Sequence, residues 1–395
     1  MTHARKPLRV CHVAYSFYES DNRVIRYAEA LAARGDQVDV IGLRGDGAQR
    51  RTTSNGVAVL AIQKRARNET AAWTYLVKIL WFFLQTFVLL GVRSIRKPYD
   101  VVHVHNIPDF LVFVALVPKI RGARIILDIH DVVPELYCGR FRRSQTAILF
   151  RALVIVERLS CAFADHVVVA NDLWLPLLQS RSLGNTRSTV LLNYPDESLF
   201  RSEPRPSRTG DPFVLVYPGS LSHHQGLDIA IRAFATARGA VPDAKLVICG
   251  DGPARDSLQR IARDLCEPGQ IEFLARKPIS EIPSLLRAAD VGIVPKRADG
   301  FGDNAFSTKV LEFMAAGLPV ILARTSIDEH YFDDSVVRFF TPGDAGHLAD
   351  QIQWAYHHRS DLSAMAQRAS EYVSRFSWRR HQSSYIGIID GTTDT

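Results

Sequence analysis

The chain has few cysteines, and none of them falls in a paired motif. There are five among 395 residues, and no two form a Cys-x-x-Cys pair. They are Cys11, Cys138, Cys161, Cys249 and Cys266. Most lie in apolar runs, so we expect buried free thiols in a reducing cytoplasm rather than a disulfide framework. The apolar run at 8–15 is short and alternates like a strand, which argues against a secretory signal peptide.

Signatures of nucleic-acid and dinucleotide binding are also missing. The sequence shows no zinc-ligand spacing, no helix-turn-helix pattern and no basic run interleaved with aromatic residues, so no nucleic-acid partner is expected. No G-x-G-x-x-G follows the first strand, which makes a dehydrogenase a poor fit. Positive charge is instead concentrated near the N-terminus. The chain carries 48 Lys and Arg against 41 Asp and Glu, and residues 1–98 alone hold 16 basic and 7 acidic residues. This excess indicates a polyanionic neighbour, such as phosphates or acidic lipid headgroups.

Two similar halves alternate short apolar strands with helices. Strands are expected at 8–14, 38–43, 101–105, 125–129, 167–170, 189–192, 213–217, 245–249, 271–274, 291–294 and 319–323. Helices are expected at 21–34, 110–120, 226–238, 254–265, 282–288 and 307–316. This alternation predicts an α/β fold with parallel sheets covered on both faces. The polar, proline-rich segment 201–212 marks the linker, and a cleft at the carboxyl ends of the strands is the expected ligand site.

The segment from Phe306 to Gly317 carries the strongest functional signal. It follows a strand and a loop with Gly300 and Gly302, and Ser307 or Thr308 is positioned to cap a helix that Gly317 ends. A helix N-terminus at this place is an anion site suited to a diphosphate. Lys309 adds a positive charge, and Glu312 lies on the same helix face, where a carboxylate suits the two hydroxyls of a ribose. Spacing alone would favour a solvated Lys–Glu pair instead.

The wider pattern resembles family 4 of the retaining glycosyltransferases, over nearly the whole chain. The matching segments, in order, are Gly219–Gly226, Cys249–Pro253, Phe273–Ala275, Ala289–Val291 and Glu312–Gly317. The resemblance implies the GT-B architecture, with two Rossmann-like parallel-sheet domains facing across a cleft. It places an acceptor-side domain at 1–205 and a nucleotide-sugar donor domain at 206–375, with a C-terminal helix at about 376–392 packing back on the first. It also implies a metal-independent hexosyltransferase that needs no cofactor beyond the UDP- or GDP-linked sugar.

The resemblance assigns the donor-binding residues. Glu312 matches the family's ribose ligand, and the loop from Gly219 matches the loop that grips the donor phosphates. Three positions depart from the family. Ser220 and Gln225 replace an Arg and a Lys of that loop, and Asn304 replaces the first Glu of a Glu-x7-Glu motif. Either Lys309, helix N-termini and His223 or His224 take over the phosphate contacts, or donor affinity is lost. Arg276 lies near the nucleobase by resemblance, or its side chain is simply solvated.

The N-terminal half offers a second set of candidates at strand ends. His130 follows the strand at 125–129 and, by resemblance, is the cleft histidine and the best catalytic candidate of this half. Asp131 either orients His130 or caps a helix. His103, His105, Asn106 and Asp109 form a polar group that is acceptor-side or structural. Metal is rejected there, because no further ligands follow at a usual spacing. Asp21 and Arg23 either bind acceptor or donor phosphate or cap the first helix.

One apolar stretch raises a membrane question. Residues 73–92 are long enough to span a bilayer, and Arg93, Arg96 and Lys97 follow at once. Lys78 and Gln85 argue against a span, as does its position between strands of one domain. It is therefore either a mostly buried crossover helix or a helix lying in the membrane interface, with residues 73–97 on anionic lipid. We expect a cytoplasmic protein, peripheral on the inner face of the plasma membrane.

The sequence thus predicts a retaining glycosyltransferase of cell-surface polysaccharide synthesis. It would move a sugar from a nucleotide-sugar donor to a glycan or lipid-linked glycan. Two alternatives stay open. One is a non-catalytic nucleotide or glycan binder, suggested by Ser220, Gln225 and Asn304. The other is a nucleotide-sugar epimerase on the same architecture, which would need a carboxylate and base set that the sequence does not distinctly show.

Overall fold

The computed structural model describes residues 6–45, 47–65, 72–141, 148–202, 212–299 and 301–392. Contacts divide the chain into two units, one of residues 1–193 and 382–395 and the other of residues 194–381. The limits expected from the sequence, 1–205 and 206–375, differ from these at their edges. Most of the expected linker, residues 203–211, lies outside the described residues, as does Gly300.

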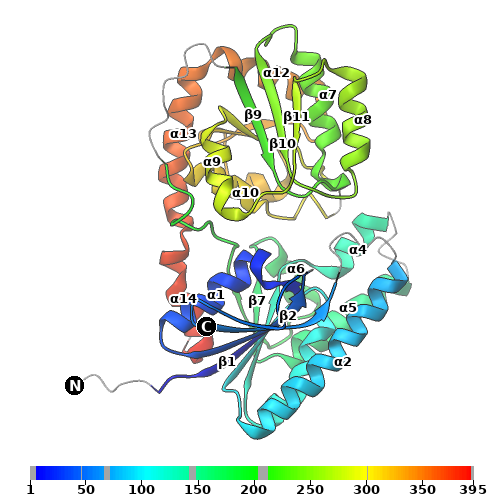
Figure 1. The fold of residues 1–395 in the computed structure, drawn as a ribbon, viewed down its shortest axis with the longest axis vertical. Coiled ribbons are helices and arrows are strands. Elements are labelled where there is room, and N and C mark those ends of the chain that lie inside the picture. The colour runs from blue at the N-terminus through cyan, green and yellow to red at the C-terminus, as the bar shows by residue number, and fades with distance from the viewer. Residues whose placement is uncertain are drawn as a thin grey trace, which may run out of the picture. The chain divides into compact units, whose positions relative to one another are not determined.

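The first unit is built on an eight-stranded sheet with the order β3-β4-β2-β1-β5-β6-β7-β8 (Figure 1). Its strands are β1 (Arg9–Phe17), β2 (Gln37–Arg44), β3 (Arg51–Ser54), β4 (Val57–Lys64), β5 (Val101–His105), β6 (Arg124–Ile129), β7 (His166–Val169) and β8 (Arg187–Val190). Every neighbouring pair is parallel except β3 and β4, which form a hairpin that the sequence analysis missed. Buried, β-branched strands of this kind need cover on both faces.

Helices supply that cover on opposite sides. They are η1 (Tyr18–Ser20), α1 (Asn22–Ala33), α2 (Ala72–Arg96), η2 (Asp109–Ala115), α3 (Leu116–Ile120), α4 (Val133–Phe141), α5 (Ile148–Phe163) and α6 (Trp174–Arg181). After β1 the chain moves along the sheet toward β2, whereas from β4 onward it moves the other way. Right-handed crossovers therefore place α1 on one face and α2, η2, α3 and α5 on the other.

Several helical segments of the first unit differ from the expectation. The helix expected at 110–120 starts as the 3-10 turn η2 and becomes an α-helix only in α3. Pro118 lies inside α3 and has no N–H to donate to the carbonyl of Val114. Helices α4, α5 and α6 were not expected from the sequence.

The second unit is a six-stranded, fully parallel sheet with the order β11-β10-β9-β12-β13-β14. Its strands are β9 (Phe213–Pro218), β10 (Ala244–Cys249), β11 (Ile271–Leu274), β12 (Val291–Val294), β13 (Val320–Ala323) and β14 (Arg338–Phe340). The helices are η3 (His223–Gln225), α7 (Leu227–Ala237), α8 (Arg255–Leu265), η4 (Ile279–Glu281), α9 (Ile282–Arg287), α10 (Thr308–Ala315), α11 (Ser326–Tyr331), α12 (Ala345–His357), α13 (Arg359–Val373) and η5 (Ser374–Phe376). Phe213, Phe234 and Phe340 are fully buried in the core between sheet and helices.

Both sheets reverse their strand order at a central strand. In the second unit β9 pairs with β10 on one side and β12 on the other, and in the first unit β1 pairs with β2 and β5. Ligands of open α/β sheets bind outside the carboxyl ends of strands at such reversals. The predicted fold class, with two Rossmann-like parallel-sheet domains, is confirmed, and each unit has its own candidate site.

The last helix, α14 (Trp378–Asp390), completes the first unit. The contact division assigns its residues from Gln382 onward to that unit. Tyr385 is fully buried, and its ring stacks on Tyr27 of α1 with centroids 4.1 Å apart. Asp390 accepts hydrogen bonds from Arg34 at 3.0 and 3.1 Å.

Candidate functional site

In the second unit, two loops at the strand ends are locked together by close backbone contact. The Arg297 N–H donates to the carbonyl of His224 at 3.0 Å. Gly226 has a φ of 67°, and a Cβ there would come within 1.9 Å of the Pro295 carbonyl oxygen. Only glycine fits that position without moving a backbone. The loop after β9 and the loop after β12 therefore form one rigid edge.

Lys309 lies at the centre of this edge. Its Nζ donates to Oε1 of Gln225 at 3.2 Å and lies 4.9 Å from the centroid of the Tyr217 ring. A Cβ on Gly219 would come within 3.0 Å of the Lys309 side chain. Three residues that the sequence analysis assigned to donor binding are thus brought together. Tyr217 was missed, because an aromatic residue in a buried strand looks like ordinary core.

The charge of Lys309 is finely balanced. Burial lowers its pKa to about 8, while Glu312, one turn along α10, opposes the shift and Lys296 adds to it. An ammonium with this pKa is largely protonated at pH 7 and sensitive to a nearby anion. A bound phosphate would therefore raise the pKa of Lys309 and be held by it.

A buried ion pair holds the loop that leads into α10. The Nζ of Lys296 lies 2.7 Å from Oδ2 of Asp328 and donates to the Ala305 carbonyl at 2.8 Å. Lys296 is 4% exposed and Asp328 is fully buried. The same loop is tied to α11 through Asp303, which accepts hydrogen bonds from the N–H and hydroxyl of Ser326. The sequence analysis missed this pair, because its partners are far apart along the chain and in no known motif.

The helix-capping expectation was wrong. Ser307 occupies the N-cap position of α10, yet neither its side chain nor that of Thr308 caps the helix. The Ser307 hydroxyl has no partner in the described residues. No side chain therefore caps the first turn of α10, where the Val310 N–H donates to the Ser307 carbonyl at 3.1 Å, and an anion could be bound by the N–H groups before it.

The remaining donor candidates lie at the same edge or on the surface. Asn304 lies in the turn that precedes α10, and its N–H donates to the Phe301 carbonyl. Ser220 is exposed, and its carbonyl accepts from the Tyr217 hydroxyl at 3.0 Å. Arg276 is exposed in the loop after β11. Their roles toward a donor stay predictions.

In the first unit, the candidate site is organised by Asp128 at the end of β6. Arg23 of α1 donates from Nε and Nη2 to the two carboxylate oxygens, both at 2.8 Å, and from Nη1 to the Leu191 carbonyl. Arg23 is 4% exposed and Asp128 is fully buried. The structure therefore contradicts an acceptor-side role for Arg23, whose guanidinium is a buried ion-pair partner.

His130 lies against the same carboxylate. Its Nε2 is 3.0 Å from Oδ2 of Asp128 and 3.1 Å from Nδ1 of His105, which is itself 3.1 Å from that oxygen. Burial would raise the pKa of Asp128, but Arg23 and then His130 outweigh it and hold that pKa well below its usual range. Asp128, rather than Asp131, thus orients His130. Burial raises the pKa of Asp131, and its carbonyl accepts a hydrogen bond from Asn106.

Asn106 and Asp21 are scaffold residues. The Asn106 amide donates to Asp109 and to the Asp131 carbonyl, both at 2.7 Å, and its oxygen accepts from the His130 N–H at 2.8 Å. It thereby fixes the backbone that carries His130. Asp21 caps α1 by accepting from the Val24 N–H and also accepts from the Ser16 hydroxyl. The capping alternative for Asp21 is confirmed.

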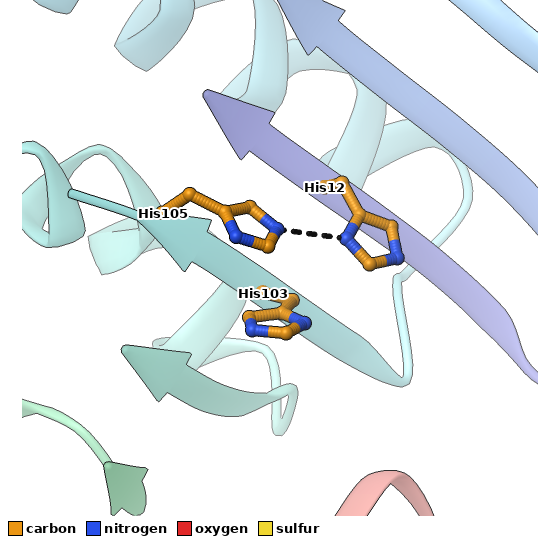
Figure 2. Close-up of side chains that lie close together, drawn as sticks. All are labelled: His12, His103 and His105. Atoms are coloured by element: carbon orange, nitrogen blue, oxygen red, sulfur yellow. Dashed lines mark hydrogen bonds between the residues drawn. The ribbon is translucent and has the colours of Figure 1, made fainter. Parts of the chain in front are cut away.

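Three buried histidines continue this network into the sheet (Figure 2). His12 of β1 pairs directly with His103 of β5, and His105 follows two residues later on the same face. Nδ1 of His12 lies 3.1 Å from Nε2 of His105. Burial lowers the pKa of all three, so they are neutral at pH 7. Tyr27 stacks on His103 and His105, and the Tyr385 hydroxyl lies 3.2 Å from Nδ1 of His103.

This cluster contains enough possible ligands for a metal ion, so a metal can no longer be rejected on the spacing of ligands along the sequence. Ligand atoms of His12, His103 and His105 lie within 4.8 Å of one another, as do those of His105, Asp128 and His130. The sequence analysis found no third ligand, because these groups come from three different strands. Arg23 already engages both oxygens of Asp128, and its charge would oppose a dication. Metal independence therefore stays a prediction, now on electrostatic rather than spacing grounds.

Comparison with known proteins identifies the family. Residues 21–193 match the family model "Glycosyl transferase 4-like domain", and residues 200–372 match "Glycosyl transferases group 1". The chain belongs to the family 4 glycosyltransferases. This confirms the resemblance inferred from the Glu312–Gly317 segment and its companions.

Solved structures with the same fold are distant in sequence. Sucrose-phosphate synthase of Thermosynechococcus elongatus superposes with a TM-score of 0.77 at 16% identity, over 97% of this chain and all of that one. HepE of Anabaena, solved in complex with UDP, gives 0.71 at 18% identity, again over 97% and 100%. These likenesses establish the GT-B fold.

Curated relatives match only in part. A D-inositol 3-phosphate glycosyltransferase of Corynebacterium kroppenstedtii is 30% identical over 42% of this chain and 37% of its own length. A GDP-mannose-dependent alpha-(1-6)-phosphatidylinositol monomannoside mannosyltransferase of Mycolicibacterium smegmatis is 36% identical over 29% and 31%. The chain spans about a third of the length of these two relatives.

The histidine cluster predicts an acid-sensitive first unit. The pKa values of His12, His103 and His105 are lowered by burial, so the unfolded chain binds up to three more protons below pH 6.5. The contribution of these three histidines to stability should be fully present above pH 6.5 and fall below it, with a slope approaching about 4 kcal/mol per pH unit. Thermal unfolding between pH 8 and pH 5 measures this. His12→Phe should reduce the slope, whereas the exposed control His330→Gln should not. Equal slopes for wild type and both variants would contradict the prediction.

Lys309 predicts a pH-dependent affinity for nucleoside diphosphate. As the pH rises through about 8, the ammonium loses its proton and the attraction for phosphate weakens. The Kd should rise, approaching about tenfold per pH unit well above the pKa. Isothermal titration with UDP or GDP from pH 7 to 9.5 tests this. Lys309→Met should bind weakly at every pH, and the control Lys245→Met, at an exposed lysine of β10, should keep the wild-type profile. A pH-independent wild-type Kd would refute the role.

Proposed function

We propose that the protein is a retaining, metal-independent hexosyltransferase that uses a UDP- or GDP-linked sugar. The acceptor is a glycan or lipid-linked glycan in cell-surface polysaccharide synthesis. One observation carries the donor assignment. Ser220 and Gln225 lack the charges that the family places in the phosphate loop, yet the ammonium of Lys309 lies 3.2 Å from Gln225 and beside Gly219. A positive charge is thus kept at that loop by a residue from another element.

The donor half of the reaction follows from this placement. Breaking the sugar–phosphate bond develops negative charge on the leaving diphosphate. Lys309 and the uncapped N–H groups of α10 offset that charge where it forms. Glu312 accepts hydrogen bonds from the donor ribose, as the family resemblance implies. A nucleotide-linked donor is supported by one relative named as GDP-mannose-dependent and by a structural neighbour solved with UDP.

The first unit supplies His130. Its Nε2 faces Asp128 and His105, so the ring is held at a fixed angle. Its side chain is 23% exposed, whereas that of Asp128 is fully buried. The exposed edge is available to hydrogen-bond a sugar hydroxyl or a phosphate oxygen. A lipid-linked glycan acceptor is supported by one relative, which is named for phosphatidylinositol monomannoside.

A non-catalytic binder is the alternative that the uncharged phosphate loop favours. A thermal-shift panel of UDP, GDP, ADP and their sugars addresses the donor first. One nucleotide class should stabilise the protein, by about 2.7 kcal/mol at a hundred times its Kd. Nucleotide release with a lipid-linked glycan acceptor then separates enzyme from binder. Stabilisation without hydrolysis or transfer would favour the binder, and conversion of the sugar without release would favour the epimerase.

His130 should contribute to turnover rather than to nucleotide binding. His130→Ala removes a hydrogen-bond donor at the reacting sugar, and we expect kcat to fall about 10²–10³-fold with the Kd for free nucleotide unchanged. Single-turnover transfer and nucleotide titration measure the two quantities. His330→Ala, at an exposed histidine of the second unit, is the matched control. An unchanged kcat would remove His130 from the mechanism.

A further inference from the structure

The first unit exposes large apolar side chains along three neighbouring helices. We name this surface the α2–α5 face. Its residues are Leu76, Val77, Leu80, Trp81, Leu84, Val88, Val92 and Ile95 of α2, Leu116 and Ile120 of α3, and Ile148, Leu149, Ile155 and Leu159 of α5. Elsewhere in the described residues, Leu265 is the one comparable exposed side chain. Scattered apolar residues need no explanation, but a contiguous set marks an interaction surface.

The α2 helix is apolar on both its inner and its outer side. Ile79, Phe82 and Leu90 are buried against the unit, whereas Trp81 is 55% and Ile95 is 62% exposed. The helix meets the length and hydropathy of a membrane span, yet only 28% of its most apolar window is buried. The mostly buried crossover helix considered from the sequence is therefore wrong. A helix that is apolar all round requires an apolar neighbour on its outer side.

The α5 helix extends the same surface, which the sequence did not reveal. Both helices pack on η2, with Phe83 of α2 5.9 Å from Phe110 and Phe163 of α5 5.1 Å from Phe113, centroid to centroid. Figure 1 shows α2 and α5 running along the unit near one another. Right-handed crossovers place both on the face of the sheet opposite α1. The apolar side chains thus form a broad surface rather than a single stripe.

The exposed charges on α2 and α5 themselves are basic, and the exposed Asp165 after α5 is paired with Lys119 of α3 at 2.7 Å. The α2 helix contains no Asp or Glu. Arg96 and Lys97 are exposed at its C-terminal end, whereas Arg93 is paired with Asp39 at 3.0 Å. The α5 helix has one acid, Glu157, which is buried and paired with Arg181, while Arg151 and Arg158 are exposed. A second copy would set the same positive charges against one another, which disfavours self-association through this face. Anionic lipid headgroups satisfy both the apolar surface and the positive charges.

We propose that the α2–α5 face docks the first unit on an anionic lipid bilayer, with the helices lying in the interface. The topology excludes a membrane span. The α2 helix connects β4 to β5 of the same sheet, so both ends of the helix lie on the same side of a membrane. The apolar side chains enter the acyl boundary, and the basic residues contact phosphates. Docking concerns this surface alone and does not depend on the proposed sugar transfer.

Vesicle co-sedimentation of the full chain tests the proposal. Vesicles of phosphatidylcholine with 30% phosphatidylglycerol, roughly the anionic content that attracts basic segments, should bind the protein, and pure phosphatidylcholine should bind it at least tenfold more weakly. Leu80→Glu with Leu84→Glu should lower binding at least tenfold. Ile155→Glu with Leu159→Glu should do the same, although α5 is distant in sequence. Leu265→Glu, at the exposed apolar residue of the other unit, should bind as wild type does.

Companion measurements keep the result interpretable. Thermal unfolding and nucleotide affinity of each variant should match wild type, because the substituted side chains are exposed. Docking is supported if the double variants lose vesicle binding while their thermal stability and nucleotide affinity stay at the wild-type values. Absence of wild-type binding at low salt, or wild-type binding that neither double variant weakens, overturns it. Self-association of wild type that the same variants abolish, without vesicle binding, would assign the face to a second copy and also overturn the proposal.

Discussion

The first unit depends on one buried ion pair between Arg23 and Asp128. The pair is bidentate, and the side chains of Arg23 and Asp128 are 4% and 0% exposed. Neither charge can therefore be solvated by water if its partner is removed. Removing one partner of such a pair typically costs about 3–5 kcal/mol, because the other charge is left buried. The pair also ties α1 to β6 and, through the Leu191 carbonyl, to the end of β8. The same carboxylate then orients His105 and His130, so folding and site geometry share one anchor.

The site loops of the second unit are fixed mainly by close contact between backbones. Gly226 lets one loop approach the Pro295 carbonyl, and Lys296 with Asp328 fixes the loop before α10. These two contacts fix the loop before α10, the short helix that carries Lys309. Its pKa of about 8 reflects burial in this rigid edge rather than a flexible surface position. The two candidate sites thus differ in kind, one built on a buried ion pair and the other on locked loops.

What the sequence predicted was local along the chain. The strand–helix alternation and the placement of Lys309 and Glu312 one turn apart on α10 rest on short spacings, and they agree with the structure. The anion site at α10 stays a prediction. Asp128 was passed over in favour of Asp131, because a buried ion pair with Arg23 leaves no spacing to detect. His12 could not be joined to His105 from sequence alone, since only the parallel register of β1 and β5 brings them together. The α5 surface was missed for the same reason.

The histidine cluster also explains why the first unit needs the last helix, α14. His12, His103 and His105 are neutral and buried, so their ring nitrogens and faces need partners from the protein. Tyr385, from the last helix, supplies a hydroxyl to His103 and a ring face to Tyr27. The second unit is therefore inserted between two segments of the first. Because Tyr385 approaches the sheet from the α1 side, this closure leaves the α2–α5 face, on the other side, free to meet its own partner.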